Sequence, residues 1–504
     1  MAKLLRAREW PASGEKKQLP APQRIGVLGG GLAGLAAATA LAERGAQVFL
    51  FEKENMLGGR LACWQDRLKD GSAHSMDRGF HAFFRQYYNL RSLMRRVDPE
   101  LRMLTPLHDY PIFGPHRRAL SFADLPKLPP LNVATLLMRS RMMRLRELAK
   151  VPASASLAMF DYDPERTVDA WDACSAKDYL DALNFPPLAR QMLFDVFSHS
   201  FFSAEQELSA AELLMQFHFY FLGNPEGIVF DVMNCSFAEG LVNPLRAYLE
   251  ARGVEVHLGQ GVEAVSAQGS GFRLHAGALE QEVDGLVVAM NVPGLKALVA
   301  ASPELGDARW REDIQRLGVT RPFAVWRLWQ DRKVAADRAA FVGTAGYGLL
   351  DNISIYERFH RESQEWSQSQ GGSVVELHAY AVEESLDEDA IRRDLRHHLW
   401  KLYPETREAK VVDERFLLRR DCPSFEPGSA AFRPGIETPH PQLCLAGDYV
   451  RLPFPSALME RAVSSGFLAA NALLSRQRTE GESLRSVPCR GLLAGLPWLP
   501  TRSA

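Results

Sequence analysis

The first part of the chain alternates apolar runs with a glycine turn, in an order that predicts the strands and helices of an α/β protein. An apolar strand over 24–28 leads through a glycine turn, 29–34, into an Ala-rich helix expected over 35–43. A second apolar strand, 48–51, follows this helix and ends at Glu52. Strand, helix and strand in this order predict a βαβ unit with two parallel strands.

Further pieces of the same pattern recur much later in the chain. Residues 241–252 place apolar side chains at helical spacing and are followed by a strand over 254–258. The run 285–290 is apolar throughout, which is typical of a parallel strand buried on both faces. A last strand, 443–446, precedes a helix expected over 457–473. We expect these pieces to join the first βαβ unit in one discontinuous domain.

Two insertions of different character separate these pieces. Residues 101–235 are rich in Met, Leu and Phe and are expected to be mostly helical, whereas 296–410 hold alternating strands and a helix. The predicted division is a disordered leader (1–22), a nucleotide-binding domain (23–100, 236–295 and 411–475), a second domain facing substrate and membrane (101–235 and 296–410) and a C-terminal tail (476–504).

Composition narrows the class of protein. The 504 residues are 46% hydrophobic and carry a formal net charge of -2, so no basic field favours nucleic acid as a partner. The six cysteines form no CxxC pair, which argues against a metal or redox-disulfide site and favours free thiols in a reducing compartment. No apolar run reaches the roughly 18 residues of a transmembrane helix. The polar start lacks the apolar core of a secretory signal peptide, and we expect a cytoplasmic protein.

The glycine turn at 29–34 carries the spacing of a dinucleotide-binding fingerprint. Gly29 permits the tight turn, Gly31 lets the backbone approach a pyrophosphate, and Gly34 allows close packing of helix and strand. The N–H groups at the helix start then face the phosphates. Glu52 ends the second strand about 20 residues later, where a carboxylate binds the ribose 2′-OH. The alternative is a Gly-rich turn without a ligand.

Two further motifs extend this nucleotide site. Gly58, Gly59 and Arg60 form a second glycine turn soon after Glu52, and Gly447-Asp448 closes the last predicted strand. An Asp at that position can accept hydrogen bonds from a ribityl hydroxyl and from backbone near a pyrophosphate. The dipole of the helix that follows favours negative charge on a reduced flavin. The alternative is an ordinary strand–turn–helix in which the Asp caps the helix.

In order and spacing, the three motifs resemble the flavin amine oxidase and phytoene desaturase superfamily. The resemblance implies FAD, held by a Rossmann-like, glutathione-reductase-like domain interleaved with a substrate domain of helices plus a mixed sheet. It places Glu52 at the adenosine ribose and Val262 beside the adenine. Asp448 and Met459 are implied along the ribityl and flavin segment, and Arg60 near the phosphates or flavin. The full implied cofactor set is Gly29, Gly31, Ala33, Gly34, Glu52, Lys53, Gly58, Gly59, Arg60, Gly79, Phe80, Val262, Gly447, Asp448, Leu458 and Met459.

A narrower resemblance comes from segments 76–90, 215–223, 226–232, 427–429 and 457–462. Together they are similar to the aryl-carotenoid synthases (isorenieratene synthase, the β-carotene desaturase/methyltransferase). This resemblance implies conversion of a carotenoid β-ring into an aromatic ring, by desaturation with intramolecular methyl migration, and a quinone or O2 as electron acceptor. The alternatives are a carotene desaturase of the phytoene or ζ-carotene type, a flavin-dependent carotenoid cis–trans isomerase, a flavin amine oxidase and a non-catalytic flavoprotein.

Several side chains are candidates for the chemistry of such a ring. A cationic intermediate is stabilised by aromatic faces, although aromatics at helical spacing are also typical of a core. His81 is the candidate to handle a proton, or else binds the flavin or a carbonyl. Arg85 is the candidate to polarise the flavin or hold Asp77, or else forms a structural ion pair. The aromatic substrate candidates, besides Phe80, are Phe83, Phe84, Phe217, Tyr220 and Phe221.

A carotenoid is insoluble in water, so a membrane surface is an expected partner. Residues 131–150 interleave Leu and Met with Arg and Lys, which suits a helix lying in an anionic membrane surface. The segment 492–499 contains Trp498 and is a second candidate for insertion at the interface. The alternative for 131–150 is an amphipathic helix packed on the protein.

Overall fold

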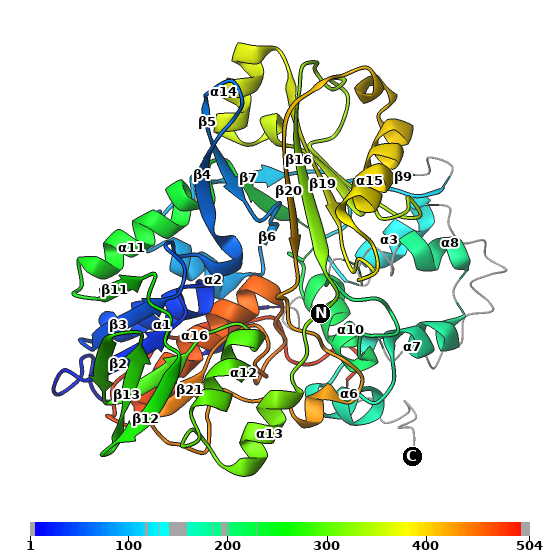
Figure 1. Cartoon of the computed structure of the whole chain (residues 1–504). Helices are drawn as coiled ribbons and strands as arrows, with labels where there is room; N and C mark the ends of the chain where they lie inside the picture. Colours follow the sequence, from blue (N-terminus) through cyan, green and yellow to red (C-terminus); the bar gives the residue numbers. More distant parts are fainter. Residues whose placement is uncertain are drawn as a thin grey trace.

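A five-stranded parallel sheet holds together segments from both ends and the middle of the chain (Figure 1). The computed structural model describes residues 6–115, 119–129, 131–140, 159–184, 186–192, 199, 201–227 and 229–494. The strand order is β11 (Glu255–Leu258), β3 (Gln47–Glu52), β2 (Arg24–Leu28), β15 (Gly285–Val288) and β21 (Leu443–Leu445), with every neighbouring pair parallel. The predicted discontinuous assembly of these strands is therefore seen in the structure.

Helices α1 (Leu32–Ala42) and α16 (Leu458–Ser475) cover one face of this sheet. Small residues let the two helices approach closely: a Cβ at Gly466 would lie 2.1 Å from the Ala33 oxygen. Helix α1 begins at Leu32, three residues before the start expected from the sequence, because Gly31 with extended backbone is its N-cap. Both helices begin beside the cavity described below.

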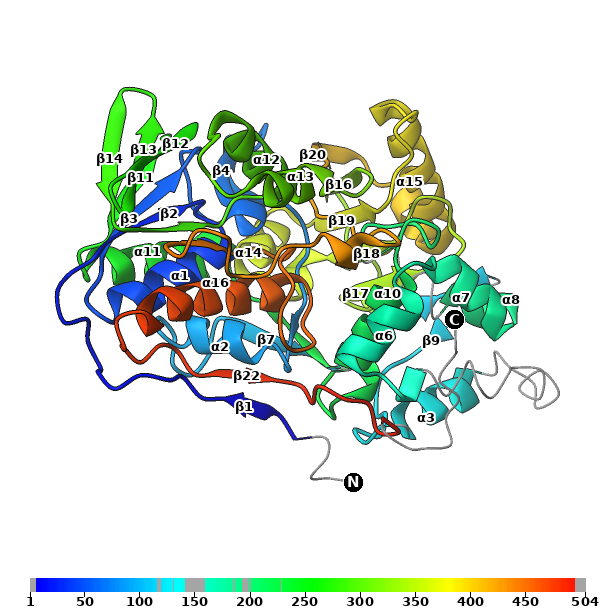
Figure 2. The same cartoon turned by 90° about the horizontal axis from the view of Figure 1, so that it is seen from below.

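The opposite face of the parallel sheet is covered by a small antiparallel sheet and two helices, as Figure 2 shows from below. These elements are β12 (Ala264–Gln268), β13 (Gly271–Ala276), β14 (Leu279–Val283), α12 (Val292–Ala301) and α13 (Ala308–Arg316). Helix α11 (Asn243–Glu250) precedes β11, after a turn of π-helix over Ala238–Val242. The predicted helix over 241–252 is thus divided between two helix types.

A second, seven-stranded mixed sheet forms the core of the other domain. Its order is β20 (Val411–Arg419), β16 (Phe323–Gln330), β19 (Ser373–Ala379), β18 (Asn352–Ile355), β17 (Phe341–Thr344), β8 (Ile112–Phe113) and β9 (Ala119–Leu120). Helix α15 (Glu388–Leu402) packs the predicted stripe Ile391, Leu395 and Leu399 against one face. Strand β19 is buried at every position, although its sequence alternates apolar and polar residues, because its other face packs on β5 and the cavity.

The insertion 101–235 is less uniformly helical than expected. It contributes β7 (Leu104–Leu107) and β10 (Phe230–Met233), which pair with each other, and β10 also pairs with β6 (Phe83–Phe84). Its helices are α3 (Leu131–Ser140), α6 (Pro164–Trp171), α7 (Ala176–Leu183), α8 (Pro187–Arg190), α10 (Ala210–Phe217) and the π-helix η4 (His218–Leu222). The remaining elements are β4 (Cys63–Arg67), β5 (Ala73–Asp77), α2 (Tyr88–Met94) and α14 (Arg361–Gln370).

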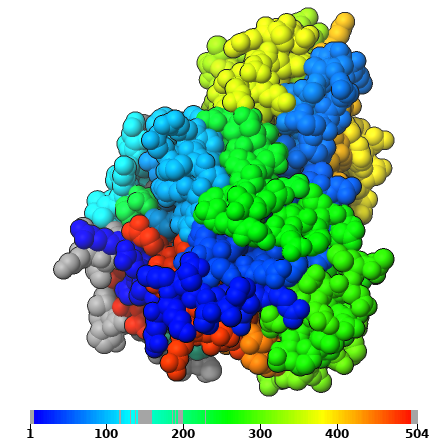
Figure 3. All heavy atoms as spheres, turned by 90° about the vertical axis from the view of Figure 1, so that its left-hand side faces the viewer, coloured from blue at the N-terminus to red at the C-terminus, as the bar shows by residue number. Residues whose placement is uncertain are grey.

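The expectation of a disordered leader over 1–22 does not hold for its described part. Strand β1 (Arg8–Trp10) pairs antiparallel with β22 (Leu484–Ser486) in the tail. The Trp10 indole N–H donates to the Ser486 hydroxyl at 2.9 Å. In Figure 3 the blue N-terminal segment accordingly runs across the surface beside red C-terminal residues. The polar leader is therefore held by pairing with a segment that local sequence patterns do not reveal.

The two segments proposed to meet a membrane are only partly described. Helix α3 covers 131–140, whereas 141–150 and 495–499 lie outside the described residues. Within the part of the chain that the structure describes, every helix is too short or too polar to span a bilayer.

Candidate active site

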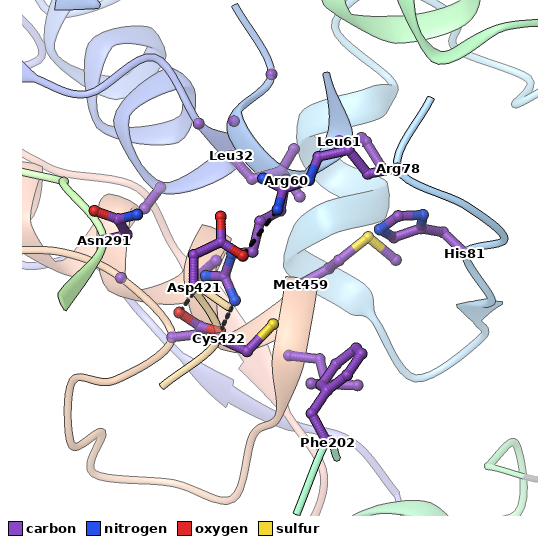
Figure 4. A pocket seen from close by; sticks show the side chains of 18 of the residues that line it. Leu32, Arg60, Leu61, Arg78, His81, Phe202, Asn291, Asp421, Cys422 and Met459 are labelled. Atoms are coloured by element: carbon purple, nitrogen blue, oxygen red, sulfur yellow. Dashed lines mark hydrogen bonds and ion pairs between the residues drawn. The ribbon is translucent and has the colours of Figure 1, made fainter. Parts of the chain in front are cut away.

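One cavity of about 1030 Å³ lies between the parallel sheet and the seven-stranded sheet. Its wall runs from the glycine turns after β2 to a group of aromatic side chains in the second domain. In Figure 4, Arg60, Cys422, Met459 and His81 all face this space. The nucleotide motifs and the aromatic candidates therefore belong to a single site.

The nucleotide end of the cavity is built from two glycine turns that touch each other. The Gly58 N–H donates to the Gly30 oxygen at 2.8 Å, and Gly31 and Gly58 form a β-bridge. A Cβ at Gly31 would meet only the Gly59 Cα, at 3.9 Å, so the backbone there is open to the cavity. Gly34 has the other role, since a Cβ there would lie 1.9 Å from the Gly29 oxygen. Gly34 accordingly does not line the cavity.

Glu52 is held in place by backbone donors on both of its carboxylate oxygens. One oxygen accepts from the Gly30 N–H at 2.7 Å and the other from the Glu54 N–H at 3.0 Å. The side chain is buried yet lines the cavity together with Lys53 and Val262. These contacts orient the carboxylate toward the space that the fingerprint assigns to a ribose.

Arg60 and Asp448 join the second and third motifs through a two-pronged ion pair. The two N–H···O distances are 2.8 and 2.5 Å. Burial disfavours the Arg60 charge, but the Asp448 carboxylate more than compensates and raises the pKa of Arg60. The Asp448 side chain is 7% exposed and that of Arg60 32%, and both line the cavity. The sequence patterns predicted both residues but not the bond between them.

Helix α16 presents its first residues to the same space. Leu458 has φ 49, a left-handed conformation that a non-glycine residue adopts at an energetic cost and that clusters at functional sites. Leu458 and Met459 both line the cavity. Gly447, with φ 149, is held by a hydrogen bond from its N–H to the Ser465 hydroxyl at 2.8 Å.

The chemistry of this end fits FAD. The glycine backbone leaves room for a pyrophosphate, and no side chain caps the N-terminus of α1 at Gly31, so helix N–H groups remain for phosphate oxygens. The oriented Glu52 carboxylate suits a ribose hydroxyl, and Arg60, Asp448 and Met459 lie farther along the wall.

Aromatic side chains dominate the opposite end of the cavity. Phe80, Phe84, Tyr220 and Phe221, among the predicted residues, line it. Phe83 and Phe217 do not: both are buried in neighbouring clusters, as expected for aromatics at helical spacing. Aromatic residues missed from the sequence are Tyr110, Phe122, Phe201, Phe202, Phe230, Phe323, Phe341 and Tyr380. They come from seven separate segments, so no local motif could have identified them.

His81 lies in the cavity wall, where it is held by the backbone. Its Nδ1 lies 2.7 Å from the Gly79 oxygen, which accepts the ring N–H, and its ring packs edge-on against Phe237. Burial lowers the pKa of His81 to about 4, so the ring is neutral near pH 7. Gly79 itself does not line the cavity, and its N–H donates to the Asp77 carboxylate at 2.8 Å.

The structure does not bring Arg85 to the cavity. Its guanidinium lies 3.6 Å from the Asp231 carboxylate, and its side chain is 42% exposed. The role of holding Asp77, considered for Arg85, belongs instead to Arg327 of β16, whose guanidinium donates to the Asp77 carboxylate at 2.8 Å. Arg85 is thus a partly exposed ion-pair residue, as the alternative interpretation of the sequence had it.

A buried polar network, missed from the sequence, forms the wall behind Phe80. Arg327 also donates to the Glu376 carboxylate at 2.8 Å, and His378 lies 2.8 Å from the other oxygen of Glu376. Burial raises the pKa of Asp77, whereas the Arg327 charge and the His378 contact outweigh burial and lower the pKa of Glu376. In the sequence these residues are polar positions within strands. The same pattern is typical of a strand with one face exposed to water, so it does not indicate a buried network.

Within the described part of the chain, no group of three or more His, Cys, Asp or Glu side chains has the arrangement needed to hold a metal ion. The six cysteines are unpaired. Cys422 lines the cavity, and burial raises the pKa of its thiol to about 11.

Comparisons with known proteins agree with this site. Residues 32–474 match the family model described as flavin containing amine oxidoreductase. The chain is 47% identical to a carotenoid phi-ring synthase of Streptomyces griseus, over 94% of this chain and 92% of that protein. It is 27% identical to a 15-cis-phytoene desaturase of Synechococcus elongatus, over 90% of this chain and 96% of that protein. A structure of putrescine oxidase bound to putrescine has the same fold, with a TM-score of 0.66 at 14% identity, covering 90% of this chain and 100% of that one.

Proposed function

Because the chain belongs to the family of flavin containing amine oxidoreductases, we propose that it uses FAD to convert an end ring of a carotenoid into an aromatic ring. One observation carries this proposal: the glycine turns, Glu52, Arg60 and Asp448 line the same cavity as the group of aromatic side chains. The 47% identity to a carotenoid phi-ring synthase over 94% of the chain supports a carotenoid end ring as the group that fills it.

In this proposal the residues divide the work along the cavity. Glu52 and the glycine turns hold the adenosine and pyrophosphate, and Arg60, Asp448 and Met459 hold the flavin end. Bound FAD supplies a hydride acceptor. The aromatic end binds the ring and excludes water, so a ring cation is stabilised by π-faces rather than captured by water.

Aromatisation of a β-ring requires that one of its two geminal methyl groups move to the neighbouring carbon. We assign this migration to the ring cation itself, so that no methyl donor is needed. Phe80 stacks on Phe341 at 4.4 Å and packs edge-on to Phe230 at 6.0 Å, which fixes a π-face in the cavity wall. The similarity to the phi-ring synthase of Streptomyces griseus favours a phi-type ring as product.

The test is incubation of the FAD-loaded protein with β- or γ-carotene in liposomes, followed by mass and absorption of the products. A phi-type aromatic end group is the expected product. Added double bonds without a change of ring would identify a desaturase, and unchanged mass with altered double-bond geometry an isomerase. If the protein oxidised an amine but no carotenoid, it would be an amine oxidase, and the proposed function would be wrong. Turnover under anaerobic conditions, with and without a quinone, separates the two electron acceptors, quinone and O2.

Carotenoid entry is assigned to helix α3, which lies on the aromatic end of the cavity. The Asn132 amide donates to the Phe221 oxygen at 2.9 Å, and Leu136 packs in a cluster with Ile112 and Phe122, both of which line the cavity. The opposite face of α3 exposes Leu131 and Met138, the latter at 73%. One face of α3 packs on residues of the cavity wall, and in this proposal the other face presents its apolar groups to a membrane surface.

Replacing Met138 by Glu tests this entry site. We expect M138E to bind anionic vesicles more weakly and to lose turnover with carotene in liposomes, while turnover with carotene in detergent micelles is kept. The control is Val168→Glu, at an exposed apolar position of α6. Equal vesicle binding by M138E and the wild-type protein would remove α3 from the membrane contact.

A further inference from the structure

Strand β19 and the residue that follows it place three protonatable side chains in a row that leads to the cavity. Glu376, His378 and Tyr380 are two residues apart, so they project from the same face of the extended chain. Glu376 and His378 are buried, and His378 and Tyr380 line the cavity. This row of residues is not used by the function proposed above.

The hydrogen bonds of this row define a direction for proton transfer. Arg327 keeps Glu376 ionised, so the Glu376 carboxylate accepts the Nε2–H of His378, at 2.8 Å. The His378 Nδ1 then carries the lone pair and accepts the Tyr380 hydroxyl proton, also at 2.8 Å. The Tyr380 oxygen in turn accepts the Asn352 amide N–H at 3.0 Å. A phenol oxygen accepts more than one hydrogen bond, so it retains acceptor capacity toward the cavity.

Tyr380 shares the cavity with residues of both of its ends. Its ring packs edge-on to Phe202 at 4.9 Å, and both side chains line the cavity. Cys422 and Arg60, the partner of Asp448, line the same cavity. Behind Tyr380 along the strand, Glu376 accepts the Phe80 N–H at 2.9 Å. The Tyr380 side chain therefore belongs to the one space that holds the flavin-end residues and the aromatic residues.

We propose that Tyr380 removes the proton of the cationic carotenoid ring and that His378, paired with Glu376, retains it. This inference rests on the function proposed above, which provides the cation by hydride loss to the flavin. It adds the protein groups that complete each desaturation.

The step balances without any further reactant. The ring C–H bond breaks and its electron pair becomes the new C=C bond, while the proton bonds to the Tyr380 oxygen. The original Tyr380 proton passes to Nδ1 of His378, so the tyrosine ends neutral. The imidazolium formed is stabilised by the Glu376 carboxylate and loses its proton to water after the product leaves.

Other groups of the cavity are less suited to this task. Asp421 is bound to Arg78 and Asp448 to Arg60. Asp351 accepts the Tyr380 N–H and contacts His199. The strongest rival is His81, whose Nδ1 is bound to the Gly79 carbonyl rather than to a carboxylate, and whose low pKa of about 4 makes it a weak proton acceptor.

The experiment compares three variants with wild-type FAD-loaded protein in carotene liposomes. Tyr380→Phe removes only the hydroxyl, His378→Gln removes the proton store, and His81→Gln removes the rival. The control is Tyr347→Phe, a buried tyrosine outside the cavity whose hydroxyl donates to the Gly114 oxygen. FAD content, carotene binding by fluorescence quenching, single-turnover product formation and its solvent deuterium isotope effect are measured for each.

We expect Y380F and H378Q to bind FAD and carotene normally but to form aromatic product about 100-fold more slowly, the lower range for loss of a general base. The solvent isotope effect of the wild-type protein should vanish in Y380F, and oxygenated carotenoids should accumulate where water captures the cation. Y347F should resemble the wild-type protein, whereas H81Q, whatever its rate, should keep the solvent isotope effect that Y380F loses.

Two results would overturn the relay while leaving the proposed function standing. One is aromatic product from Y380F at the wild-type rate. The other is loss of FAD or carotene binding in step with turnover, which would make Tyr380 structural. If instead the wild-type protein binds FAD and carotene and forms no aromatic product, the proposed function itself fails, and the relay fails with it.

Discussion

At the residue scale, Gly31 and Gly34 show one residue type meeting two different demands within a single turn. Gly31 has an ordinary backbone conformation, and its missing side chain leaves open space on the cavity side. Gly34 is surrounded, because the Gly29 oxygen occupies the place of a side chain. The first glycine therefore serves the ligand and the second serves the fold.

This difference predicts opposite behaviour of two alanine variants. Gly31→Ala should fold with wild-type stability as apoprotein and lose FAD, because its methyl group stands where the pyrophosphate approaches. Gly34→Ala should lower the stability of the apoprotein by about 1–3 kcal/mol, the usual cost of overpacking. Thermal unfolding of apoprotein and the FAD content after purification measure both effects. Tight FAD binding by G31A would show that the cofactor does not cross this turn.

Sequence reasoning located residues whose position is set by near neighbours. Glu52 follows its strand directly, and the fingerprint spacing alone places it beside the glycine turn. Arg60 and Asp448 were each found in a motif, but their ion pair spans 388 positions of the chain. Tyr380 was missed because its role depends on Asn352 and Phe202, which come from other segments.

At the scale of elements, the π-helix η4 (His218–Leu222) joins α10 to the cavity wall. A π-helical turn inserts one extra residue into a helix and is frequent at functional sites. Here it places Tyr220 and Phe221 at the cavity and turns His218 inward, where Nε2 lies 2.6 Å from the Pro488 oxygen and the ring stacks on Tyr162. From helical periodicity, Phe217 and Tyr220 were both candidates for contact with the substrate. The change from α-helix to π-helix between them leaves Phe217 in the core and places Tyr220 in the cavity wall.

The buried His218 should make this element sensitive to acid. Burial lowers the pKa of His218 to about 4, so between about pH 6.5 and pH 4 the unfolded chain binds a proton that the folded protein does not. The free energy of unfolding therefore falls as pH falls through this range, by up to about 3 kcal/mol from this residue. His218→Gln keeps an N–H donor for Pro488 and should flatten that dependence in urea unfolding of FAD-saturated protein.

The matched control for this acid sensitivity is His108→Gln, at an exposed position. It should leave the slope of unfolding free energy against pH unchanged. An equally steep slope in H218Q would assign the sensitivity to other histidines whose pKa values burial lowers, such as His74 and His360, to about 3, and His81, to about 4.

Elements were predictable where their pattern is local. The apolar run at 285–290 indicated a buried parallel strand, and β15 lies between β2 and β21 in the sheet. The strands β6, β7 and β10 are short and pair across long separations, so their backbone partners cannot be inferred from periodicity. The leader was misjudged for the same reason, because a three-residue segment with two charged residues forms a strand only when a partner strand is present.

At the scale of the whole molecule, a strand from the first residues of the described chain pairs with one from its last residues. Strand β1 pairs with β22, and the Trp10 ring packs against Phe454 with centroids 5.1 Å apart. Phe454 is buried in the loop that connects Asp448 to helix α16. The residues at the two ends of this loop, Asp448 and Leu458, line the cofactor end of the cavity. The N-terminal segment thus braces, through Phe454, a loop whose ends both contribute to the cavity.

This bracing predicts that Trp10 affects FAD retention although it lies outside the cavity. Trp10→Ala should lower the free energy of unfolding by about 2 kcal/mol, less than for a fully buried Trp because Trp10 is only partly buried. Release of the Asp448–Phe454 loop should also speed FAD dissociation, measured by the recovery of flavin fluorescence on dilution. Glu9→Ala changes an exposed neighbour on the same strand and should alter neither quantity. If W10A matched E9A in both measurements, the pairing of β1 with β22 would be dispensable, and residues 8–10 would have no more effect on the fold than the disordered leader first expected.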